Sequence, residues 1–187
     1  MAGISGYNLC TILSKRLYMQ RIITMLIGCL WLSLTARAEP VPEYVMKATY
    51  LYNFALYTEW PASVGDTINL CVLGHEEFGS ALDAINGKQV NNLSLNISRV
   101  SSTSNLKLCQ MVFIGEGEAN NAQKILDVLG DAPVLTVTEG PAPLHVGVIV
   151  SMVVEDRKLV FHINASAARR AKLNISSKLL RLARSVY

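Results

Sequence analysis

The chain has 187 residues, and its formal net charge of +3 comes from 17 Lys and Arg against 14 Asp and Glu. A chain of this length is typical of one domain with a short additional segment. The leading 38 residues hold four of the basic residues and none of the acidic ones. The remaining chain is therefore close to neutral, which excludes the basic footprint expected of a nucleic-acid-binding domain.

The leading segment has the features of a secretory signal peptide. A basic stretch that ends at Arg21 precedes an apolar run over residues 22–34, and an Ala-Arg-Ala motif that ends at Ala38 provides the small residues that signal peptidase reads. The apolar run is shorter than the ~20 residues of a membrane-spanning helix. We therefore predict a signal peptide over residues 1–38 and export to the periplasm of a single domain, residues 39–187.

Two alternatives concern the same leader. Met19 lies just before Gln20-Arg21 and can be the true start of translation. The Leu-Ile-Gly-Cys motif that ends at Cys29 resembles a lipoprotein box, which would make Cys29 the lipidated first residue of the mature protein. Apolar sequence continues beyond it to Leu34 and reaches the site at Ala38, which favours a cleaved peptide over lipidation.

Cys71 and Cys109 are the two cysteines outside the leader. An even pair in an exported protein predicts a disulfide, which would contribute a few kcal/mol in the chain-entropy model. Two buried free thiols are the alternative. A zinc site fits less well, because the two cysteines lack the C-x-x-C spacing of such sites.

The start of the exported domain predicts a helix over residues 43–59. Pro42 suits the first helical position, no Gly or Pro interrupts the segment, and Trp60-Pro61 ends it. Apolar residues cover most of the circumference, so this helix must be buried by more than one neighbour. We expect the domain body on one side and something else on the other.

Short apolar or alternating segments between turn residues predict strands at residues 67–73, 93–98, 109–114, 134–137, 146–154 and 158–163. Helical patterns predict helices over residues 76–85, 118–129, 166–172 and 176–186. The last two strands form a hairpin. This order favours an α/β fold in a single domain, with a mixed, mostly parallel sheet, an antiparallel hairpin and helices on both faces.

The sequence gives little support to an enzyme. It has no G-x-S-x-G, no P-loop and no paired-His zinc motif, and His75, His145 and His162 are scattered. Glu76 and Glu77 follow a predicted strand, where open α/β sheets often bind ligands, but acidic residues are also favoured in the first turn of a helix. We expect no catalytic residue, no metal and no cofactor.

Two groups of residues are candidates for binding another molecule. The first group is aromatic and consists of Tyr50, Tyr57 and Trp60, since aromatic residues are enriched at interfaces. At helical spacing, aromatic residues are equally often part of the core. We interpret Tyr52 and Phe54 in this second way.

The second group is basic and lies in the closing segment, where no acidic residue follows Asp156. Arg169, Arg170 and Lys172 begin it. They can bind an acidic partner or a small anion, since guanidinium groups bind carboxylates bidentately, or they can simply be solvated.

Motifs across the exported domain resemble those of the YfiR-like family of bacterial periplasmic proteins. They are KATYLYNF at residues 47–54, Glu59-Trp60-Pro61, LCVLG at 70–74, FHIN at 161–164, AAR at 167–169 and LNISSKLLRLA at 173–183.

The resemblance implies a soluble periplasmic repressor that forms homodimers. Such proteins bind the periplasmic sensor domain of an inner-membrane diguanylate cyclase and hold it inactive, and their release raises cyclic di-GMP and promotes biofilm formation. An outer-membrane OmpA-like lipoprotein can sequester the repressor. The alternatives to this function are a periplasmic small-ligand-binding module and, with least support, an enzyme.

The resemblance also bears on individual residues. Cys71 and Cys109 match the principal disulfide of the family, whereas His145 and Met152 lie where its well-known member has a second cysteine pair. A redox switch needs a strained or accessible disulfide, so this departure puts redox regulation in doubt. By the same resemblance, Phe161, Arg169, Arg170 and Lys172 lie where partner or ligand contacts fall.

Overall fold

The computed structural model of the chain describes residues 42–74, 78–140, 146–156 and 158–187. The predicted signal peptide, with the alternatives at Met19 and Cys29, lies outside the described residues. Within the described part, the structure contains no helix that is both long enough and apolar enough to span a membrane.

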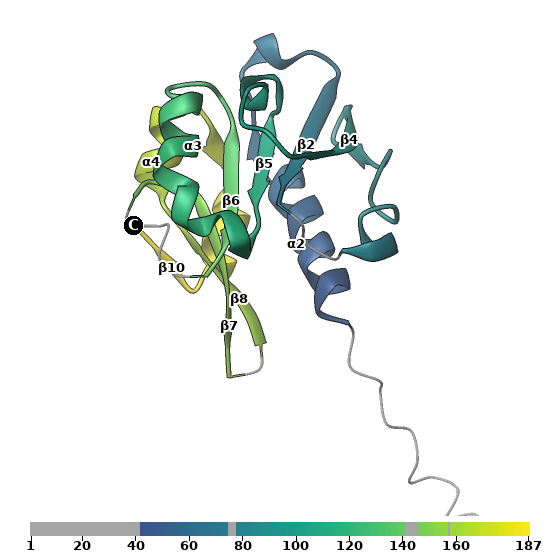
Figure 1. Cartoon of the computed structure of the whole chain (residues 1–187), viewed down its shortest axis with the longest axis vertical. Helices are drawn as coiled ribbons and strands as arrows, with labels where there is room; N and C mark the ends of the chain where they lie inside the picture. Colours follow the sequence, from purple (N-terminus) through teal and green to yellow (C-terminus); the bar gives the residue numbers. More distant parts are fainter. Residues whose placement is uncertain (1–41, 75–77, 141–145, 157) are drawn as a thin grey trace, which may run out of the picture. The chain divides into compact units, whose positions relative to one another are not determined.

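The centre of the domain is an eight-stranded sheet with the order β10-β8-β7-β6-β5-β2-β4-β3 (Figure 1). Its strands are β2 (Thr67–Leu73), β3 (Gln89–Val90), β4 (Leu93–Val100), β5 (Met111–Ile114), β6 (Leu135–Glu139), β7 (Val150–Glu155), β8 (Lys158–Ile163) and β10 (Ser185–Val186). Neighbouring strands from β4 through β7 are parallel, while β7 and β8 form an antiparallel hairpin. The predicted mixed, mostly parallel sheet is confirmed.

Helices cover both faces of this sheet. They are α2 (Glu43–Leu56), α3 (Ala122–Leu129), α4 (Ala165–Arg170) and α5 (Ser177–Leu182), together with the 3-10 turns η1 (Ala62–Val64), η2 (Gly79–Ala81), η3 (Leu106–Leu108) and η4 (Glu116–Asn121). Successive side chains of a strand point to opposite faces. Leu70 and Val72 therefore join the larger core with α2, α4 and α5, while Cys71 and Leu73 join the smaller core with α3.

The first helix is buried on one face rather than all round. Leu51, Phe54 and Ala55 are fully buried in the larger core, whereas Val45 is 42% exposed. The helix ends at Leu56, before the predicted boundary at residue 59. The residues that follow instead form β1 (Thr58–Glu59), which pairs antiparallel with β9 (Asn174–Ile175) in a separate two-stranded sheet.

The predicted helix over residues 76–85 is wrong where it can be compared, because residues 78–85 contain only η2 and turns. Gly79 has a φ of +51°, which lies outside the right-handed helical region. The predicted helix over residues 118–129 begins as the 3-10 turn η4 and becomes α-helical only at Ala122.

Two further boundaries differ from the prediction. The strand predicted over residues 146–154 begins at Val150, because Gly147 has a φ of +112° in a turn. The helix predicted over residues 176–186 ends at Leu182, and the chain then pairs with the free edge of β8. The Arg184 and Tyr187 amides donate to carbonyls of β8, and these long-range hydrogen bonds override the local helical pattern.

Candidate interaction surface

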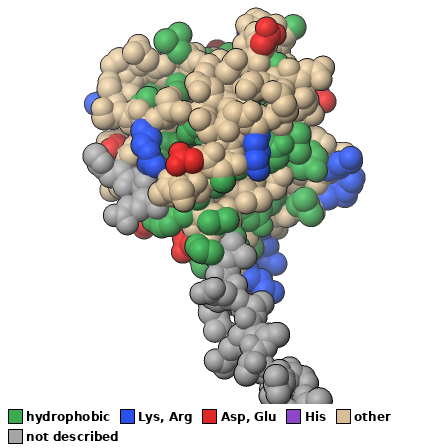
Figure 2. Space-filling view, turned by 90° about the vertical axis from the view of Figure 1, so that its right-hand side faces the viewer, with side chains coloured by type: hydrophobic (Ala, Val, Ile, Leu, Met, Phe, Trp, Pro, Cys, Tyr) green, Lys and Arg blue, Asp and Glu red, His purple; other side chains and the backbone are tan. Residues whose placement is uncertain are grey.

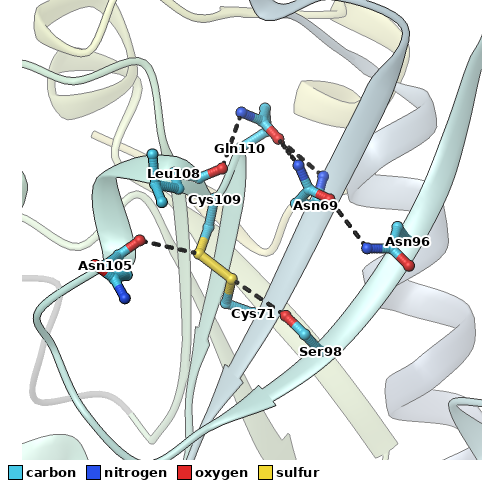
Figure 3. The surroundings of a disulfide bond; sticks show 8 residues. All are labelled: Asn69, Cys71, Asn96, Ser98, Asn105, Leu108, Cys109 and Gln110. Atoms are coloured by element: carbon cyan, nitrogen blue, oxygen red, sulfur yellow. Dashed lines mark hydrogen bonds between the residues drawn. A yellow bond between two sulfur atoms is a disulfide. The ribbon is translucent and has the colours of Figure 1, made fainter.

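The disulfide between Cys71 and Cys109 is present and joins β2 to the segment before β5 (Figure 3). The two Cα atoms are 6.0 Å apart, and 38 residues separate the cysteines in sequence. Each cysteine is only 4% exposed, and both belong to the smaller core. A buried bond of this kind fastens two strands and gives reductants little access.

A row of amide side chains, formed by Asn96, Asn69 and Gln110, runs beside the disulfide (Figure 3). The backbone and side-chain amides of Asn69 both donate to Gln110 Oε1, at 2.9 and 3.0 Å, and Asn96 donates to Asn69 Oδ1 at 3.1 Å. The indole of Trp60 donates to the carbonyl of Gln110 at 3.0 Å. Trp60 is therefore held against the residue that follows Cys109, with part of its ring left accessible.

Tyr50 and Phe161, both predicted to contact a partner, differ in exposure. Phe161 is 3% exposed and packs edge-on against Phe54 and Tyr50, with ring centroids 5.1 and 5.6 Å apart. Tyr50 is half-buried, and its hydroxyl donates to the Leu159 carbonyl at 3.2 Å. Phe161 thus packs beneath Tyr50 inside the core, and we do not count Phe161 among the surface residues that can contact a partner.

The small sheet of β1 and β9 brings the opening and closing motifs of the domain together. Thr58 is paired with Ile175, and the Ser176 amide donates to the Tyr57 carbonyl at 2.9 Å. Asn174 also donates from its side chain to Glu59 Oε2 at 2.7 Å. Sequence reasoning missed this contact, because two strands of two residues each carry no periodic pattern.

The candidate basic residues surround the end of α4. Arg169 and Arg170 form its last turn, and Lys172 follows in a left-handed conformation with a φ of +58°. All three side chains are exposed, and Arg169 donates to Ser166 Oγ at 3.1 Å. Tyr57 precedes β1, Trp60 follows it, and Tyr50 lies on α2. We use the name interaction surface for these three aromatic residues and the three cations together, the residues predicted to contact a partner.

The face of the molecule seen after a 90° turn from the view of Figure 1 carries both hydrophobic and charged side chains. In Figure 2 hydrophobic side chains gather in separate patches, with single cationic side chains between them.

Lys47 is the one charged residue among the buried polar residues of the described chain, at 3% exposure. Its ammonium forms ion pairs with Glu43, at 2.6 Å, and with Glu139 at the end of β6, and it lies 4.7 Å from the centre of the Tyr44 ring. Burial acts to lower the pKa of Lys47, but the hydrogen bonds and charges of Glu139 and Glu43 outweigh it and raise the pKa above its ordinary value.

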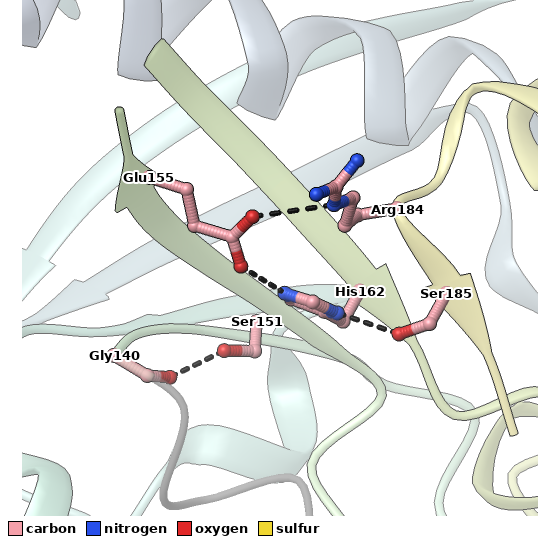
Figure 4. A network of polar contacts seen from close by, with 6 residues as sticks. All are labelled: Gly140, Ser151, Glu155, His162, Arg184 and Ser185. Carbon is pink, nitrogen blue, oxygen red and sulfur yellow. Dashed lines mark hydrogen bonds and ion pairs between the residues drawn. The ribbon is translucent and has the colours of Figure 1, made fainter. Parts of the chain in front are cut away.

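A serine, a histidine and a glutamate meet where β10 joins the hairpin (Figure 4). His162 Nδ1 is 2.6 Å from Ser185 Oγ, and His162 Nε2 is 3.6 Å from Glu155 Oε1. These are the residue types of a hydrolase triad, which the sequence did not suggest. The nearby Arg184 and Tyr187 amides, however, donate within the sheet and so cannot stabilise an oxyanion, while the Arg184 side chain pairs with Glu155 at 3.2 Å.

This cluster therefore ties the end of the chain to the hairpin. The described residues also contain no group of three or more His, Cys, Asp or Glu side chains that could hold a metal ion.

The fold and this surface define a small α/β domain fastened by one disulfide. Over residues 44–184 the chain matches the family model described as YfiR/HmsC-like, and it belongs to this family. The resemblance seen in the opening and closing motifs is confirmed.

Among similar solved structures, the first supports the fold. A conserved domain protein from Vibrio cholerae has a TM-score of 0.53 at 10% identity, and the match covers 78% of this chain and 60% of that one. A Streptococcus pneumoniae ABC domain in complex with L-Trp has a TM-score of 0.47 at 12% identity, with 64% and 55% covered. The chain thus spans less than two thirds of either protein.

Proposed function

We propose that this protein is a periplasmic regulator that represses an inner-membrane diguanylate cyclase by binding the periplasmic sensor domain of that enzyme. Repression lowers cyclic di-GMP and biofilm formation. The observation that carries the proposal is membership of the YfiR/HmsC-like family over residues 44–184. The protein acts by binding rather than by catalysis, and it reaches the periplasm through removal of the leader up to Ala38.

The mechanism we infer is a shift of population. A repressor holds a receptor off only if it binds the inactive state better than the active one, and a ~10⁴-fold preference moves a receptor from almost fully active to almost fully inactive. The interaction surface is the natural place for that preference. Its exposed cations, Arg169, Arg170 and Lys172, suit an acidic partner, and its aromatic side chains supply apolar area.

We infer two further binding partners for the same surface. A second copy of the chain would form a homodimer, and an OmpA-like outer-membrane lipoprotein would relieve repression by competing for the regulator. Half-buried aromatic side chains such as Tyr57, at the end of α2, and Trp60, directly after β1, are suited to such an exchange, since they are accessible without unfolding the domain.

The test is a binding titration of residues 39–187 against the periplasmic domain of any diguanylate cyclase encoded beside this protein. We expect micromolar or tighter affinity, and a loss of about tenfold or more in the Arg169→Glu, Lys172→Glu double variant. The matched control is the Lys107→Glu, Lys124→Glu double variant, which reverses the same number of exposed charges on η3 and α3, on the other face of the sheet.

Equal losses of affinity in the two double variants would show that net charge alone matters and would remove the surface from the proposal. Absence of binding by the unmodified domain would overturn the repressor function for that cyclase.

A further inference from the structure

A pocket of about 150 Å³ opens between α3, α4, Thr136 of β6 and the segment that precedes β7. Residues of both helices line the pocket. Its apolar lining includes Leu126, Leu129, Ile149 and Ala167. A cavity of this size in another protein holds one benzene ring, so the space fits a ring or a short branched chain.

One wall of the pocket carries a positive charge. The side chain of Arg170 lines it, and within the described residues this guanidinium has neither an ion pair nor a hydrogen bond. Its neighbour Arg169, in contrast, is bound to Ser166. A guanidinium beside apolar walls binds a carboxylate in two parallel hydrogen bonds, which fixes an organic acid in one orientation.

The backbone at Gly147 keeps the approach to this guanidinium open. A Cβ atom at this position would lie 3.7 Å from Arg170 Nη2 and 3.7 Å from Leu126 Cδ1, and the φ of +112° disfavours any other residue. The absence of a side chain leaves free the space between the charged group and the apolar wall.

Thr136 adds a second polar group to the lining. It is 2% exposed, and its hydroxyl oxygen accepts a hydrogen bond from the Ile149 amide at 3.0 Å. Within the described part of the chain the hydroxyl hydrogen has no acceptor, so it can be donated to a ligand. Asp131 also lines the pocket, but it is exposed to water, which screens its charge.

We propose that this pocket binds a small organic monocarboxylate with an apolar body the size of one ring, its carboxylate on Arg170 and its body against Leu126, Leu129 and Ile149. This proposal does not depend on the diguanylate cyclase proposed above. Arg170 is the one residue shared by the pocket and the interaction surface, and the variants designed to test cyclase binding leave Arg170 unchanged.

The test uses residues 39–187 and benzoate as the probe, followed by titration in ¹H–¹⁵N NMR spectra. We expect saturable shifts of the amides of Leu129, Gly147 and Ile149, and binding at least about tenfold weaker for benzamide, which has the same shape without the charge. Arg170→Gln weakens benzoate binding by a similar factor, whereas the matched control Arg169→Gln leaves it unchanged.

Ala171→Leu, which fills part of the pocket and keeps the guanidinium, provides a second variant and is expected to abolish binding. The spectra themselves report whether each variant is folded. Four outcomes would each overturn the proposal. Two concern the probes: equal affinity for benzoate and benzamide, or tighter binding of benzylamine than of benzoate. The others are equal losses of benzoate affinity in both arginine variants, or no saturable shift with any probe.

Discussion

The ammonium of Lys47, in the middle of α2, forms an ion pair with the carboxylate of Glu139, at the end of β6, and this joins the opening helix to the sheet inside the core. The side chain of Lys47 is 4% exposed and that of Glu139 is 14% exposed. A buried pair of this kind is expensive to break, because removal of one partner leaves the other charge poorly solvated.

The first prediction concerns this pair. Lys47→Met should lower the free energy of unfolding by about 3 kcal/mol, the range found when one partner of a buried pair is lost. Glu43→Gln is the control, because Glu43 is an exposed partner at i,i+4 spacing and such pairs contribute about 0.2–0.5 kcal/mol. Urea denaturation followed by Trp60 fluorescence measures both, and similar effects of the two variants would disprove the dominant role of Glu139.

The second prediction follows from the raised pKa of Lys47. A lysine whose folded-state pKa exceeds its unfolded value of about 10.4 stabilises the fold fully below that value, and this contribution is lost as the pH rises through the folded-state pKa. The difference in stability between the unmodified domain and Lys47→Met should therefore be constant near neutral pH and shrink only in alkaline solution. Urea titrations across this range test it, and a difference that already falls between neutral pH and pH ~9 would contradict it.

The contrast between Lys47 and the strands shows what the sequence predicts well. Strands β2 and β8 consist of alternating apolar and polar residues or of continuous apolar residues over seven and six positions. This local pattern was enough to predict where both strands lie. The two cysteines were predicted to pair because both lie in an exported segment. Nothing local indicated that Lys47 would be buried, since its partner Glu139 lies on a distant strand.

Three of the elements that the sequence missed share a physical cause. β1, β9 and β10 have two residues each and exist because of backbone hydrogen bonds to segments far along the chain, such as Arg184 to Phe161. The pocket beside Arg170 also brings together residues of α3, α4 and β6, which no spacing within a single element reveals.

The third prediction concerns the disulfide. Replacement of both Cys71 and Cys109 by Ser should lower the free energy of unfolding by about 4 kcal/mol, the chain-entropy value for a loop of this length. In the folded domain the bond should also resist a mild reductant, because both cysteines are 4% exposed. Quantification of free thiols with and without denaturant measures this, and rapid reduction without denaturant would indicate an accessible, regulatory bond.

The fourth prediction separates core from surface among the aromatic candidates. Phe161→Ala should cost about 3–4 kcal/mol because it removes a ring packed against Phe54 and Tyr50, and Phe161→Leu should cost about 1 kcal/mol. The affinity of folded Phe161→Leu for the cyclase domain should stay unchanged, whereas Tyr57→Ala should weaken it with little loss of stability. Weaker binding by Phe161→Leu than by Tyr57→Ala would return Phe161 to the interaction surface.

The fifth prediction concerns the contact between His162 and Ser185. Ser185→Ala removes the hydroxyl 2.6 Å from the imidazole, at a cost of about 1 kcal/mol, and should loosen β10 from the edge of β8. The amides of Arg184 and Tyr187 should then exchange with solvent faster, while amides in β5 keep their protection, because the loss is confined to the last strand. Ser177→Ala, at an exposed serine in α5, is the matched control. If Ser185→Ala left these two amides as protected as in the control, the backbone pairing alone would hold β10 and the side-chain contact would be incidental.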